Sequence, residues 1–134
     1  MFRPPVLTAL LSSLVLAAAL PAGAAARGGG DRNEVRVNGT CGGGVRSELK
    51  LKSDDGGIEA EFEVHQARGG SAWSVTIAQE GRVAWRGRVR TGRSSRAFTL
   101  HRRLRDYAGA DGVTVRASGP SGVTCRASAT LAGD

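Results

Sequence analysis

Residues 57–65 read GIEAEFEVH, and this stretch decides the fold. Apolar side chains occupy every second position, and the positions between them carry Glu59, Glu61 and Glu63. Successive side chains of a β-strand point to opposite faces, so this period of two predicts a half-buried strand with a row of carboxylates on its exposed face. A helix would require apolar residues three or four positions apart.

The same alternation recurs on both sides of that stretch, with turn-forming residues between the runs. Seven further runs of period two lie within residues 34–41, 45–52, 73–77, 83–89, 98–104, 113–117 and 123–131. Gly, Ser, Asp and Pro separate the runs, as in Ser53–Gly57 and Ser118–Gly122. Eight candidate strands and no helical run predict an all-β fold, an antiparallel sandwich of seven to eight strands over residues 34–132.

One segment resembles immunoglobulin-like and fibronectin type III domains. Asp106–Asp111 looks like the corner before strand F of such sandwiches, although Asp111 stands nearer than Tyr107 to the position of the family's corner tyrosine. The resemblance implies an Ig-like β-sandwich architecture, not an antibody domain. Gly39–Cys41, Gly57–Val64 and Thr124–Ala129 also resemble segments of small, uncharacterised secreted bacterial proteins, and this resemblance implies no particular activity.

The pattern also predicts one hairpin in detail. If inward side chains of the runs before and after residues 79–81 face each other, the loop must contain an odd number of residues. A three-residue loop, Gln79-Glu80-Gly81, with Gly81 in the left-handed position of a bulge satisfies this condition. It places three pairs opposite each other: Ile77 and Val83, Val75 and Trp85, Trp73 and Gly87.

The N-terminal residues have the pattern of a secretion signal. Arg3 precedes the apolar run Val6–Leu20, and small residues follow Pro21 up to Ala26. We therefore expect a signal peptide over residues 1–26 and a Gly-rich, flexible lead-in over residues 27–33. The apolar run is shorter than the roughly 20 residues of a spanning helix, which favours cleavage over a retained anchor. We expect a secreted, extracellular protein with no membrane span after cleavage.

Cys41 and Cys125 are the two cysteines of the chain, and both follow the predicted signal. An even pair of cysteines in an oxidising compartment is expected to form a disulfide. The bond would join the first strand to the last one, and so differs from the disulfide of antibody domains.

The sequence predicts no catalytic, metal or cofactor site. His65 and His101 fall on the polar sides of their strands, whereas Cys41 and Cys125 face inward, so the four do not form a zinc set. No serine lies in a G-x-S-x-G elbow. We expect no enzyme, with an extracellular hydrolase as the weakest alternative.

Charge is the strongest bias in composition. The chain carries 19 Lys and Arg against 12 Asp and Glu, a net charge of +7. Nine arginines and no acidic residue occur between Arg82 and Arg105. The candidate anion-binding residues are Arg82, Arg86, Arg88, Arg90, Arg93 and Arg96. Three of these, at every second position of one predicted strand, would form a row with steps of about 6.6 Å on its outer face.

Two interpretations of this basic segment remain open. The arginines at 86, 88 and 90 could pair across strands with the Glu59–Glu63 row or with Glu48, and so only support the sheet. They could instead bind a polyanion such as a cell-wall polymer, an acidic polysaccharide or extracellular DNA. Sequence-specific recognition of nucleic acid is not expected, because both tryptophans alternate inward. The sequence thus predicts a secreted, non-enzymatic structural or interaction module, with a polyanion-binding protein as the alternative. It leaves the partner open, with an anionic polymer and a surface protein as the candidates.

Overall fold

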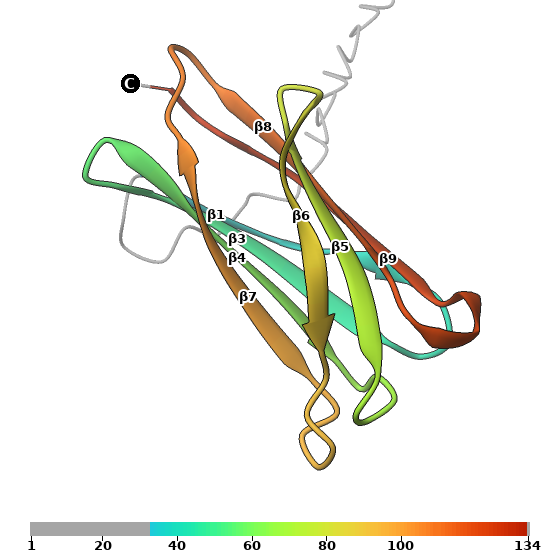
Figure 1. The fold of residues 1–134 in the computed structure, drawn as a ribbon. Helices are drawn as coiled ribbons and strands as arrows, with labels where there is room; N and C mark the ends of the chain where they lie inside the picture. Colours follow the sequence, from blue (N-terminus) through green and yellow to red (C-terminus); the bar gives the residue numbers. More distant parts are fainter. Residues whose placement is uncertain (1–32, 134) are drawn as a thin grey trace, which may run out of the picture.

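The computed structural model describes residues 33–133, which form two antiparallel β-sheets packed face to face (Figure 1). The four-stranded sheet has the order β1-β3-β4-β7, with β1 Glu34–Asn38, β3 Arg46–Asp54, β4 Gly57–His65 and β7 Phe98–Arg105. The five-stranded sheet has the order β2-β9-β8-β5-β6, with β2 Thr40–Cys41, β5 Ala72–Gln79, β6 Arg82–Arg90, β8 Asp111–Ser118 and β9 Thr124–Leu131. In this part of the chain the only helical element is a 3₁₀ turn, Pro120–Gly122. The all-β, two-layer prediction is confirmed, but there are nine strands and not seven to eight, because the first predicted run divides into β1 and β2.

The strand order differs from that of an immunoglobulin constant domain. In such a domain the second strand lies between the first and the fifth, because the chain crosses to the other sheet after the second strand. Here β3 and β4 are joined by a two-residue turn, Asp55-Gly56, within one sheet. Both turn residues have positive φ, as a tight hairpin requires. The resemblance to immunoglobulin domains therefore extends to the layered architecture and not to the strand order.

The core lies between the sheets and consists of the inward half of each alternating run. Trp73, Phe62 and Phe98 form its aromatic centre, with ring centroids of Phe98 at 6.0 Å from Trp73 and 6.1 Å from Phe62. The predicted inward residues of β3, β4, β5 and β8 are all buried. Burial at these period-two positions is what holds the two layers together, because the apolar area removed from water is the dominant favourable term in folding.

The first predicted run divides between the sheets at Gly39. Residues before it pair with β3, and Thr40 and Cys41 pair with β9. A side chain at Gly39 would collide with the Ser47 hydroxyl and lie 2.9 Å from the Arg126 carbonyl oxygen. A glycine is therefore required where the chain passes from one layer to the other.

The disulfide between Cys41 and Cys125 is present and ties β2 to β9. The two residues are direct cross-strand partners, with Cα atoms 4.2 Å apart. The bond therefore lies within the five-stranded sheet and joins the start of the fold to its end, as predicted.

The predicted β5–β6 register is wrong. The loop has two residues, Glu80 and Gly81, both with positive φ, and Gln79 pairs with Arg82. Ile77 faces Trp85 while Ala78 faces Val83, so Ala84 is an additional, bulged residue on β6.

With a two-residue loop alone, inward side chains of β5 would lie opposite outward side chains of β6. The bulge brings inward side chains opposite each other again, and it also turns Val83 outward. Val83 was predicted to face the core and is 56% exposed. Gly87 faces Val75, not Trp73, and makes room for Trp85 of its own strand, since an added Cβ would lie 2.5 Å from that ring.

The predicted signal peptide, residues 1–26, lies outside the described residues, as does the lead-in 27–33 except for Asn33. Between residues 33 and 133 there is no helix of the length and apolarity needed to cross a membrane.

Candidate anion-binding face

Alternation along β6 places Arg86, Arg88 and Arg90 on the outer face of the five-stranded sheet, where all three are exposed. Their cross-strand partners on β5 are Thr76, Ser74 and Ala72. Arg90 donates to the Gly70 carbonyl oxygen at 2.8 Å. The predicted row of arginines is therefore present, and its neighbours are small or hydroxylated.

The alternative that these arginines pair with the Glu59–Glu63 row is wrong. That row lies on β4, on the outer face of the opposite sheet, and so on the other side of the molecule. Glu48 lies on β3 of that same sheet. The alternation that placed each row outward could not show that the two rows belong to different layers.

The four-stranded sheet balances its charges on its own face. One cross-strand row there alternates in sign and contains Glu34, Lys52, Glu59 and Arg103. Two other rows place like charges opposite each other, Arg36 with Lys50 and Glu48 with Glu63, but carboxylates lie within ion-pair distance of both basic side chains. This face carries six carboxylates and six Lys or Arg side chains: Glu34, Glu48, Asp54, Glu59, Glu61, Glu63, Arg36, Arg46, Lys50, Lys52, Arg103 and Arg105. Opposite charges across strands support a sheet, so this face is explained by its internal pairing.

Side-chain hydrogen bonds and neighbouring charges on that face shift the pKa values of two groups. Hydrogen bonding with Glu63 is the first cause that lowers the pKa of Glu61, and Lys50, whose Nζ lies 3.2 Å from the Glu61 carboxylate, lowers it further. A 2.9 Å hydrogen bond to Glu34 raises the pKa of the Arg36 guanidinium. Both charged forms are thus stabilised by local partners.

Two further arginines join the β6 row on the five-stranded sheet. Arg116 on β8 and Arg126 on β9 are exposed and lie directly opposite each other. Arg116 also lies opposite Thr76, whose other neighbour is Arg86, so Arg86 and Arg116 are two strand spacings, or about 10 Å, apart. Sequence reasoning missed this pair, although the alternation of each strand already placed both residues outward.

We call this surface the arginine face and define it by Arg86, Arg88, Arg90, Arg116 and Arg126. The outward positions between and beside these arginines carry mostly hydroxyl groups: Thr40, Ser74, Thr76, Thr114, Ser118, Thr124, Ser128 and Thr130. No Asp or Glu occupies an outward position on the strands of this sheet. Glu80, in the β5–β6 turn, accepts a hydrogen bond from the Gly112 backbone N–H.

Other arginines of the basic segment Arg82–Arg105 lie outside this row. Arg82 is the first residue of β6, beside the turn, and Arg93 lies in the loop between β6 and β7. Arg96 donates from Nε to the Ala67 carbonyl oxygen at 2.8 Å. Arg102 covers the half-buried Trp85, with its guanidinium carbon 4.4 Å from the ring centroid. The arginines between Arg82 and Arg105 therefore do not form one surface.

Electrostatics distinguishes the two outer faces. Like charges directly opposite each other destabilise a sheet, and Arg116 and Arg126 are placed in this way with no carboxylate beside them. Basic residues on an edge strand also deter aggregation, which would explain the β6 row. It does not explain Arg116 and Arg126, because β8 and β9 are interior strands. An anion bound between these guanidinium groups would offset their repulsion.

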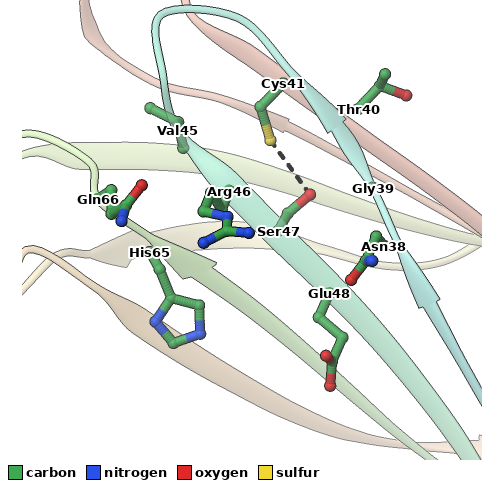
Figure 2. A pocket seen from close by; sticks show the side chains of 10 residues that line it. All are labelled: Asn38, Gly39, Thr40, Cys41, Val45, Arg46, Ser47, Glu48, His65 and Gln66. Atoms are coloured by element: carbon green, nitrogen blue, oxygen red, sulfur yellow. Dashed lines mark hydrogen bonds between the residues drawn. The ribbon is translucent and has the colours of Figure 1, made fainter.

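A groove of about 650 Å³ lies where β1 and β2 part, and it brings Ser47 and His65 into one lining (Figure 2). The Ser47 hydroxyl is buried and lies 3.2 Å from Cys41 Sγ, which must be the acceptor because a disulfide sulfur has no proton. His65 lies on the outer face and contacts Glu63 at 3.0 Å. Serine and histidine are therefore on opposite faces of the sheet and do not form a nucleophile–base pair.

The predicted histidines and cysteines are likewise separate. His101 lies 3.6 Å from the carboxylates of Glu59 and Glu61, and the cysteines are joined to each other. Within residues 33–133 no three His, Cys, Asp or Glu side chains are grouped so as to hold a metal ion. No protein-family model, curated protein or solved structure matches the chain.

Proposed function

We propose that this chain is an exported, non-enzymatic binding domain whose arginine face holds an extended anionic polymer. The observation that carries the proposal is the segregation of charge between the two sheets. One outer face pairs its charges internally, and the other presents five arginines among hydroxyl groups with no carboxylate at its outward strand positions. The signal-like N-terminus and the disulfide support export, because such bonds persist in oxidising compartments.

The chemistry of the face suits repeated phosphate, sulfate or carboxylate groups. Guanidinium groups bind such anions through paired, charge-assisted hydrogen bonds, and Ser and Thr hydroxyls add neutral donors. The three β6 arginines recur at steps of about 6.6 Å, which suits a linear chain laid along the strand. No aromatic side chain interrupts the face for base stacking, and this favours recognition of backbone charge over sequence.

Fluorescence anisotropy with labelled linear polyphosphate tests the proposal across 50–200 mM salt. If all five arginines contact anionic groups, affinity should fall by about 100- to 500-fold over this range, by analogy with a slope of roughly 0.7–0.9 per contact for nucleic acids. Heparin in a parallel titration would show whether sulfate and carboxylate serve as well as phosphate.

A matched pair of variants separates the face from net charge. The triple variant Arg86→Ser/Arg88→Ser/Arg90→Ser should lose most of the affinity and about 2–2.7 of the salt slope. The control Arg36→Ser/Arg46→Ser/Arg105→Ser removes the same charge from the opposite face and should retain both. Equal losses in the two variants would show that binding follows net charge alone and would reject the arginine face.

A further inference from the structure

A second site lies at one end of the sandwich, separate from the arginine face. The loops β2–β3, β4–β5, β6–β7 and β8–β9 meet there, at the lower end of the molecule in Figure 1. They surround a cavity of about 410 Å³, within the usual size range of small-molecule pockets. Its apolar lining includes Val45, Ala67, Trp73, Pro120 and Val123.

The polar side chains of this cavity are mostly hydrogen-bond donors, and those of Arg68, Arg96 and Ser121 are exposed. Trp73 is 1% exposed, and its Nε1 is the one buried side-chain nitrogen or oxygen in residues 33–133 that has no hydrogen-bond partner. Within the same range Arg68 and Ser121 make no side-chain hydrogen bond or ion pair, and Arg96 uses only its Nε.

Hydrogen bonds hold the backbone of the cavity rim in place. The carbonyl oxygen of Arg68 accepts from the Thr91 hydroxyl at 2.6 Å, and Thr91 is almost fully buried. Ala67 and Arg96 bond to each other twice, through the Ala67 N–H at 3.0 Å and the Arg96 Nε at 2.8 Å. The rim is therefore fixed by hydrogen bonds before any ligand arrives, which lowers the entropy cost of binding.

We infer that this cavity binds a small organic carboxylate with an apolar body. Two guanidinium groups, the Ser121 hydroxyl and the Gln66 amide lie around an apolar floor that includes Trp73, and no Asp or Glu lines the cavity. The lining thus offers donors for an anion and an apolar surface for a hydrocarbon chain, and it has nothing to neutralise a cation. The site does not depend on the arginine face, which shares no residue with it.

Indole resonances in ¹H–¹⁵N NMR spectra of the full chain test this inference. In a Trp85→Phe background the remaining indole N–H belongs to Trp73, and hexanoate is the ligand used. Hexanoate should shift that resonance saturably, while hexylamine, with the same chain and the opposite charge, should not. Acetate, which lacks the apolar body, should bind at least 10-fold more weakly.

Arg68→Gln is the informative variant, because its side chain supports no other group in residues 33–133. It should weaken hexanoate at least 10-fold, whereas Arg46→Gln, which lies outside this cavity, should leave binding unchanged. Equal shifts with hexanoate and hexylamine, or no shift with either, would overturn the inference. Because the readout is Trp73, failure here leaves polyphosphate binding by the arginine face unaffected, and the reverse also holds.

Discussion

The directly opposed pair Arg116 and Arg126 gives the sharpest prediction, because one perturbation should move stability and binding in opposite directions. If the pair is kept for a ligand, the free protein bears its repulsion. Substituting either arginine with Ser removes that repulsion, and Ser already occurs at neighbouring outward positions such as Ser118 and Ser128. The free domain should therefore become more stable while its affinity for polyphosphate falls.

The magnitude follows from the register. A directly opposed like-charge pair costs roughly 0.2–1 kcal/mol, and this corresponds to about 1–5 °C in Tm for a domain of about 100 residues. Either single variant removes the whole pairwise repulsion, so Arg116→Ser/Arg126→Ser should gain little beyond the singles. For binding, loss of two contacts should reduce the salt slope by about 1.4–1.8.

The assay is a double-mutant cycle measured by urea unfolding at 20 mM and at 1 M NaCl. The cycle isolates the pairwise term. At the higher salt the Debye length falls to about 3 Å, so the stabilisation should largely disappear. Arg46→Ser/Arg105→Ser serves as the control, since it removes the same charge from the other sheet. A pairwise term that is zero or favourable, or variants that bind polyphosphate normally, would refute the reasoning.

Three further predictions concern the frame that carries both sites. Replacing Cys41 and Cys125 with Ala should lower the free energy of unfolding by about 4–5 kcal/mol, from the chain entropy of the long closed loop, and chemical denaturation measures this. Gly119→Ala would place a Cβ 2.5 Å from the Trp73 indole and should cost about 1–3 kcal/mol; an unchanged Tm would show that this contact is easily relieved. The pKa of Glu61 is lowered on folding, so its contribution to stability is complete above the unfolded pKa and is lost as the pH falls through the folded pKa. Glu61→Gln should therefore flatten the acid limb of stability against pH and leave the slope at pH 7–9 unchanged.

The hairpin shows where prediction from the sequence failed. For inward side chains of β5 and β6 to face each other, an odd number of unpaired residues must separate the two strands, and this condition was correct. It could not decide whether those residues lie in the loop or are divided between a two-residue loop and a bulge. The structure takes the second solution, with Ala84 bulged and Val83 exposed. A Glu-Gly pair is a weak signal for a two-residue turn, because Asn or Asp is the usual first residue.

The candidate face shows the same limit at a larger scale. The outward direction of Arg86 and of Arg116 follows from alternation within each strand. Their proximity depends on β5 lying between β6 and β8, and this order is set by packing between distant segments. The expected pairing of Arg86 with the Glu59–Glu63 row failed for the same reason. Sequence distance along an Arg-rich segment was a poor guide to which arginines share a surface.

For this protein the sequence alone determined the strands, their buried faces apart from the start of β6, and the bond between Cys41 and Cys125. These features follow from the period of two along each strand and from cysteine number, and both are local properties of the chain. The tertiary structure alone decided the sheet that each strand enters, the register of β5 on β6, and the grouping of Arg86 with Arg116 and Arg126. It also formed the cavity beside Trp73. These depend on contacts between residues far apart in the chain, whose energies are set by how whole layers pack and not by any local pattern.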